Sequence, residues 1–113
     1  MKIEILYFEG CPNHPPAVSR VRGVLGELGI EWEVAEIEIT GPEMARAVGF
    51  LGSPSVRVNG LDVEPGARGS DQVGFGCRTY WDGIRREGLP SVDMIRRAIV
   101  DGGPAVEPPS AQG

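Results

Sequence analysis

The segment KIEILYF at residues 2–8 is the feature that most constrains the fold. Ile3 and Ile5 lie on one face of an extended chain, and Leu6 makes the other face apolar too. Strands that are covered on both faces have this pattern, whereas a strand with one face in water alternates between apolar and polar residues. A chain of 113 residues has room for one core around such a strand. The sequence therefore predicts a single α/β domain with residues 2–8 as a central strand flanked by helices.

Helical and extended segments alternate after this strand. Val18, Val21 and Leu25 recur at helical spacing, and Gly29 fits the end of that helix. Further elements are expected in this order: a strand over 31–39, a short helix over 41–49, a hairpin over 55–63 with an Asn59-Gly60 turn, and a helix from Ser91 that Gly102 ends. The predicted order is β-α-β-α-β-β-α.

Two glycine- and proline-rich regions fall outside this order. Residues 64–90 form a long irregular excursion, and its centre GFGCRTYW (74–81) holds aromatic residues that favour an ordered loop. Residues 102–113 have the composition of a flexible tail. We therefore expect one domain over residues 1–101 and a tail over 102–113.

Charge and hydropathy exclude several classes of protein. The formal net charge is -5 and the basic residues are scattered, which argues against nucleic-acid binding. No apolar stretch is long enough to span a membrane, and the N-terminus lacks a signal pattern, so we expect a cytoplasmic protein. Thiols in that compartment are mostly reduced, so two cysteines indicate catalysis, redox switching or metal binding more than a structural disulfide.

The element order, with Cys11 between the first strand and the first helix, resembles the thioredoxin fold. Members of that superfamily place a cis-proline just before the third strand, and Ser53-Pro54-Ser55 is similar to that segment. The resemblance covers residues 2–63 and 91–101, and it implies a mixed four-stranded sheet with a long Gly-rich insertion before the last helix. The chain looks like small bacterial thioredoxin-like proteins with a CxxH motif, some of which are grouped with organomercurial-lyase relatives.

The motif Cys11-Pro12-Asn13-His14 has a histidine where the superfamily usually has a second cysteine. A thiol at a helix N-terminus is close to unpaired N–H groups and the positive end of the helix dipole, which favour the thiolate. A protonated His14 imidazole would add to this effect. We therefore expect Cys11 to be a partly exposed nucleophile that lacks a neighbouring cysteine to resolve a mixed disulfide.

Cys77 has three possible roles: a resolving thiol, a third metal ligand with Cys11 and His14, or a small packing residue. The excursion is long, and its aromatic residues favour burial. We therefore expect it to fold back and bring Cys77 near Cys11, beside Pro54.

Three functions are compatible with these residues. The first is thiol–disulfide redox activity of Cys11 on a protein or small-molecule thiol or disulfide, with Cys77 or an external thiol as resolver. The second is soft-metal binding, of mercury, copper or zinc, through Cys11, Cys77 and His14. The third is a non-catalytic module that binds a partner beside Cys11 and Pro54. We expect no cofactor, nucleic acid or membrane as partner, and an exposed strand edge leaves dimerisation open.

Overall fold

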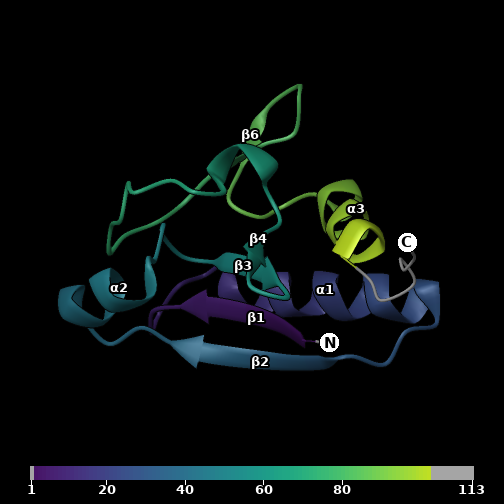
Figure 1. The fold of residues 1–113 in the computed structure, drawn as a ribbon, viewed down its shortest axis with the longest axis horizontal. Coiled ribbons are helices and arrows are strands. Elements are labelled where there is room, and N and C mark those ends of the chain that lie inside the picture. Colours follow the sequence, from purple (N-terminus) through teal and green to yellow (C-terminus); the bar gives the residue numbers. More distant parts are fainter. Residues whose placement is uncertain (1, 103–113) are drawn as a thin grey trace, which may run out of the picture.

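The structure is a computed structural model that describes residues 2–102, and a mixed four-stranded sheet lies at its centre (Figure 1). The strands are β1 (Lys2–Tyr7), β2 (Glu33–Glu38), β3 (Ser55–Val58) and β4 (Leu61–Asp62), and the helices are α1 (His14–Leu28), α2 (Pro42–Val48) and α3 (Val92–Gly102). The strand order is β2-β1-β3-β4; β1 and β2 are parallel, and the other two pairs are antiparallel. The predicted α/β class and mixed sheet are confirmed.

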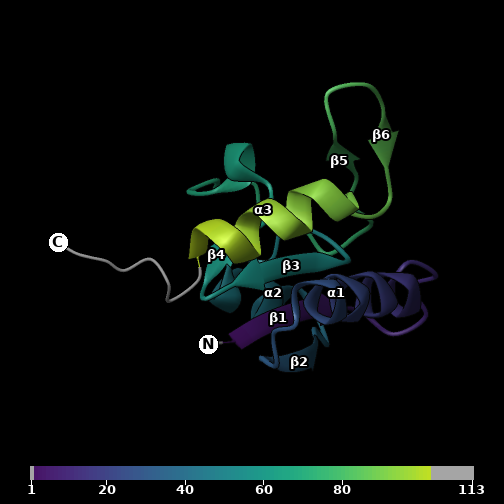
Figure 2. The same cartoon turned by 90° about the vertical axis from the view of Figure 1, so that its right-hand side faces the viewer.

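The two faces of β1 belong to two separate apolar clusters. Ile3 and Ile5 are fully buried and pair with Val58 and Val56 of β3. Their cluster includes buried residues of α1 and α3, namely Val21, Val24, Leu25, Ile95, Ala98 and Ile99. Leu6 points to the opposite face, where its cluster consists of Ile39, Ala45 of α2 and Phe50. The central strand is thus covered on both faces, as its sequence predicts (Figure 2).

Local sequence signals fix the ends of several elements. Gly29 ends α1 with φ 69°, a conformation that favours glycine. The Asn59-Gly60 turn between β3 and β4 has positive φ at both residues, 52° and 87°, as a type I′ hairpin requires. At the start of α3, the Ser91 hydroxyl accepts a hydrogen bond of 3.0 Å from the Met94 N–H.

Residues 64–90 contain more regular structure than the sequence predicts. A short 3₁₀ helix, η1 (Pro65–Ala67), is followed by the strands β5 (Tyr80–Trp81) and β6 (Arg86–Glu87), which form a separate two-stranded sheet. This small hairpin projects from the rest of the domain (Figures 1 and 2). Its Asp82 carboxylate accepts hydrogen bonds from the N–H groups of Ile84 and Arg85, which stabilise the turn.

Gly102 is the last residue of α3, and the rest of the predicted tail, residues 103–113, lies outside the described residues. Within the described part of the chain, no helix combines the length and apolar character needed to cross a bilayer.

Candidate thiol site

The segment Ser53-Pro54-Ser55 lies at the centre of the candidate site. The peptide bond between Ser53 and Pro54 is cis, as the resemblance to the thioredoxin superfamily implies. Both serines are fully buried, and the Ser55 hydroxyl donates a 2.6 Å hydrogen bond to the Gly52 carbonyl. The Ser53 hydroxyl accepts a 3.4 Å hydrogen bond from the N–H of Phe8. The segment is therefore in contact with the loop that carries Cys11.

Cys11 is buried, with only 5% of its surface exposed, so the expected partial exposure is wrong. The physical reason is a turn that precedes the helix. The Cys11 N–H donates to the Phe8 carbonyl at 3.2 Å, and Gly10 inside this turn has φ 87°. Helix α1 begins only at His14, with Asn13 as its N-cap. Cys11 thus lies before the cap and within the protein rather than at the exposed first turn.

His14 is the first residue of α1 and is bound to both neighbouring strands. Its Nε2 atom lies 2.8 Å from a carboxylate oxygen of Glu36 in β2. Its ring stacks on Tyr7 of β1, with 3.6 Å between the ring centroids. Glutamates occupy positions 31, 33, 36 and 38, a pattern that in the sequence indicates only the solvated face of a strand. Glu36 is the one that contacts His14. The parallel register of β1 and β2 brings Glu36 close to His14, and this register cannot be deduced from the sequence.

Cys77 is exposed, and its backbone lies against Ser53. The Ser53 N–H donates to the Gly76 carbonyl at 2.8 Å, and the Arg78 N–H donates to the Ser53 carbonyl at 3.0 Å. The half-exposed ring of Phe75 lies 5.5 Å from the ring of Phe8, measured between centroids. The excursion therefore returns to the Pro54 segment, as the sequence predicts.

The two cysteines are both free thiols. Among residues 2–102, no three His, Cys, Asp or Glu side chains converge closely enough to hold a metal ion. Cys11, His14 and Cys77 therefore do not form the three-ligand site that the sequence allows.

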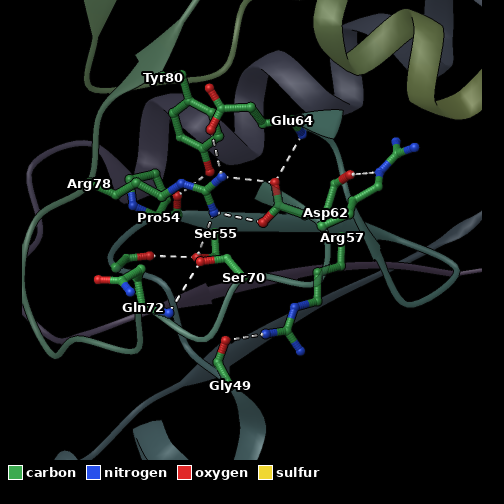
Figure 3. A network of polar contacts seen from close by, with 12 residues as sticks. Gly49, Pro54, Ser55, Arg57, Asp62, Glu64, Ser70, Gln72, Arg78 and Tyr80 are labelled. Carbon is green, nitrogen blue, oxygen red and sulfur yellow. Dashed lines mark hydrogen bonds and ion pairs between the residues drawn. The ribbon is translucent and has the colours of Figure 1, made fainter. Parts of the chain in front are cut away.

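A buried polar cluster lies directly beside the Cys77 segment (Figure 3). The Arg78 guanidinium donates to both carboxylate oxygens of Asp62, at 2.7 and 2.8 Å. It also donates to Glu64 and to the hydroxyl of Ser55, each at 3.1 Å. Only 6% of each side chain of the Arg78–Asp62 pair is exposed. Desolvation by itself would lower the pKa of Arg78, but the hydrogen bond to Asp62 and the nearby charges raise it overall.

Tyr80 completes this cluster. The Arg78 guanidinium carbon lies 4.1 Å from the centroid of the Tyr80 ring, a cation–π geometry. The Tyr80 hydroxyl donates to the Pro54 carbonyl at 2.5 Å, and burial raises the pKa of Tyr80. The sequence does not predict the cluster of Asp62, Glu64, Arg78 and Tyr80, because no local pattern links a short hairpin to residues of a glycine-rich loop.

Comparisons with protein-family models, with curated proteins and with solved structures gave no match.

The two thiols differ in exposure, and this difference determines how each of them can react. An exposed thiol such as Cys77 can attack or be attacked without any movement of the protein. A buried thiol such as Cys11 reacts with a large molecule only after its surroundings open. Ser53 and Phe8 connect the two thiol-bearing segments, because Ser53 accepts a hydrogen bond from the Phe8 N–H and its backbone bridges to Cys77.

Proposed function

We propose that this protein is a thioredoxin-like thiol–disulfide exchange protein in which Cys77 and Cys11 act as a non-adjacent pair. One observation carries the proposal. Ser53 binds the backbone of Phe8 through its hydroxyl, and it binds the backbone on both sides of Cys77 through its own N–H and carbonyl. One buried residue thus joins the loops of both thiols.

The sheet topology supports the thioredoxin-like part of this proposal. The strand order is β2-β1-β3-β4 with only β1 and β2 parallel, and Cys11 lies between β1 and α1. Side chains of α1 and α3 share one apolar cluster, while α2 contributes to the cluster on the other face. The resemblance deduced from the sequence implies a mixed four-stranded sheet with this element order.

The difference in exposure supports an order for the chemical steps. The exposed Cys77 thiolate attacks one sulfur of a substrate disulfide, forms a mixed disulfide, and releases the other substrate sulfur as a thiolate. The Cys11 thiolate then attacks the Cys77 sulfur, forms the Cys11–Cys77 disulfide, and releases the second substrate thiolate. The protein dithiol loses two electrons and two protons; the substrate gains the two electrons, and its two released thiolates take up the two protons. Two molecules of an external thiol such as glutathione reduce the Cys11–Cys77 disulfide to the dithiol and leave as glutathione disulfide.

The second step requires movement of the Cys11 loop. A disulfide needs Cα atoms about 4.4–6.8 Å apart, and Cys11 is buried in the reduced protein. The loop at residues 8–13 includes Gly10 and lies outside the sheet and the helices, so it can open without breaking the hydrogen bonds of a strand ladder.

Controlled oxidation tests the proposal. The protein is equilibrated with reduced and oxidised glutathione, alkylated, and analysed by mass spectrometry without reduction. We expect the monomer to contain a Cys11–Cys77 disulfide, whereas Cys11→Ser and Cys77→Ser each carry one glutathione instead. Recovery of only free thiols, or of disulfides only between two molecules, would overturn the proposal.

A second candidate function is a non-catalytic binding module, which the burial of Cys11 favours. The two functions differ in the reactivity of Cys11 in the folded protein. For the exchange protein, Cys11 is alkylated in the absence of denaturant through opening of its loop. For the binding module, Cys77 alone is alkylated, and Cys11 reacts only in step with global unfolding by urea.

A further inference from the structure

Cys77 and Arg78 are neighbours in the chain with opposite environments. Cys77 is exposed, while the Arg78 side chain is almost completely buried. The segment that carries both residues lies outside every helix and strand except for one isolated bridge to Ser53. This bridge supplies two backbone hydrogen bonds to the Cys77 segment, and both are made by Ser53.

The Arg78 side chain adds an attachment to a second part of the sheet. Its guanidinium binds Ser55 of β3, Asp62 of β4 and Glu64, so it fastens the Cys77 segment to the edge of the main sheet (Figure 3). The planar fork of arginine fits this arrangement, because two nitrogens serve four acceptor atoms at once.

Gly52 provides the space in which Arg78 approaches the Ser53 segment. Gly52 has φ 118°, and a Cβ atom there would lie 2.8 Å from the Cβ of Arg78. The absence of a side chain at position 52 lets the Arg78 backbone approach the Ser53 segment closely. Tyr80 adds a second attachment two residues later, through its hydroxyl to the Pro54 carbonyl.

We infer that Arg78 is a positioning residue that holds the Cys77 thiol beside the Cys11 loop and so sets the effective concentration of one thiol at the other. The inference rests on the proposed function, because it concerns the formation of the Cys11–Cys77 disulfide. A buried ion pair is by itself weak evidence for a role in stability, since both partners can often be replaced by apolar residues without loss of stability. A thiol that is held close to its partner has a higher effective concentration there than a thiol on a free loop. It therefore forms the disulfide more readily.

The test compares two arginine variants of the whole chain. Arg78→Met removes the attachment, and Arg57→Met is the matched control. Arg57 lies in β3 and donates to the carbonyls of Val48 and Gly49 at the end of α2, so it binds neither cysteine segment. The equilibrium between dithiol and Cys11–Cys77 disulfide is measured in glutathione buffers. The alkylation rate of Cys77 is measured in a Cys11→Ser background.

We expect Arg78→Met to lower the effective concentration about tenfold, because the Cys77 segment then samples more positions relative to Cys11. The alkylation rate of Cys77 should change less than about twofold, because this thiol is already exposed. Arg57→Met should change neither quantity. Arg78→Lys keeps the charge but not the fork, so it should give an intermediate loss and serves if Arg78→Met does not fold.

The outcomes separate the inference from the proposed function. A wild-type protein that forms the disulfide, with Arg78→Met and Arg78→Lys forming it equally well, overturns the inference and leaves the proposed function intact. An equal loss in Arg57→Met and Arg78→Met also overturns it, because the effect is then general destabilisation. A wild-type protein that forms no Cys11–Cys77 disulfide overturns the proposed function and this inference together.

Discussion

The imidazole ring of His14 lies almost parallel to the phenol ring of Tyr7, with 3.6 Å between the ring centroids and 3° between the ring planes. The same imidazole pairs with Glu36 at 2.8 Å. The first residue of α1 is therefore attached to β1 through stacking and to β2 through a polar contact. This double attachment fixes the helix end that follows the Cys11 loop.

Replacement of His14 should separate the two contributions. We expect His14→Ala to lower the free energy of unfolding by about 1–2 kcal/mol, the sum of an aromatic stack and a partly exposed hydrogen bond to the Glu36 carboxylate. His14→Phe keeps a ring on Tyr7 and should lose less than about 1 kcal/mol. Urea unfolding at neutral pH measures both. Equal losses in the two variants would show that stacking contributes nothing.

Tyr80 should make the protein sensitive to alkaline pH. Burial raises the pKa of Tyr80, so the folded protein holds the phenol proton more tightly than the unfolded chain does. The resulting stability is complete below the unfolded pKa of about 10 and decreases as the pH rises above it. Urea unfolding between about pH 8 and pH 11 should show this decrease.

Two tyrosine variants serve as controls for this effect. Tyr80→Phe removes the titrating group, so the alkaline decrease should become smaller. At pH 8 the same variant should be less stable by about 1 kcal/mol, because the hydrogen bond to the Pro54 carbonyl is lost. Tyr7→Phe keeps Tyr80 and should retain the full alkaline decrease. If the decrease disappears in Tyr7→Phe instead, Tyr80 is not its source.

Asp82 should titrate below the usual range of an aspartate. The N–H groups of Arg85 and Ile84 donate to its carboxylate, and these bonds lower the pKa of Asp82. The carboxylate therefore stabilises the turn between β5 and β6 above the ordinary aspartate pKa, and this contribution is lost as the pH falls through the lower pKa of the folded protein. The amide chemical shifts of Ile84 and Arg85 should report that midpoint.

The matched variant for this titration is Asp82→Asn, which keeps an acceptor oxygen but has no acidic proton. Its Ile84 and Arg85 amides should show no such midpoint. A wild-type midpoint at or above about 3.9, the value for an unperturbed aspartate, would contradict the prediction.

Local signals account for the parts of the fold that the sequence predicts. The two apolar faces of β1, the Asn59-Gly60 turn and the Ser91 cap each depend on residues close together in the chain, and each lies where those residues predict it. The β5–β6 hairpin has a local signal too, Asp82-Gly83, but its strands are only two residues long and show no alternation.

The site depends on contacts between distant residues. Arg78 binds Asp62 across 16 positions, and His14 binds Glu36 across 22, so neither pair follows from spacing or periodicity. The burial of Cys11 depends on a turn that delays the start of α1 until His14. A strand–loop–helix pattern predicts the position of the thiol but not whether the loop faces solvent.

Gly52 and Gly23 should respond in opposite directions to the same substitution. At Gly52 a Cβ atom would meet the Cβ of Arg78 at 2.8 Å and the Gly76 carbonyl at 3.2 Å, and φ is 118°. The Gly76 carbonyl also accepts the Ser53 N–H, so it cannot move away without loss of that bond. We expect Gly52→Ala to lower the free energy of unfolding by about 2–4 kcal/mol through strain and overpacking.

Gly23 is an exposed residue inside α1, and a Cβ atom there would meet nothing within 4 Å beyond its own stretch of helix. Gly23→Ala should raise the free energy of unfolding by about 0.5–1 kcal/mol, because alanine loses less conformational entropy in a helix. Urea unfolding of the two variants measures both changes. A Gly52→Ala protein as stable as the wild type would contradict the prediction. It would mean that the Cys77 segment can shift against Ser53 and that the packing of Arg78 on Gly52 does not restrain this segment.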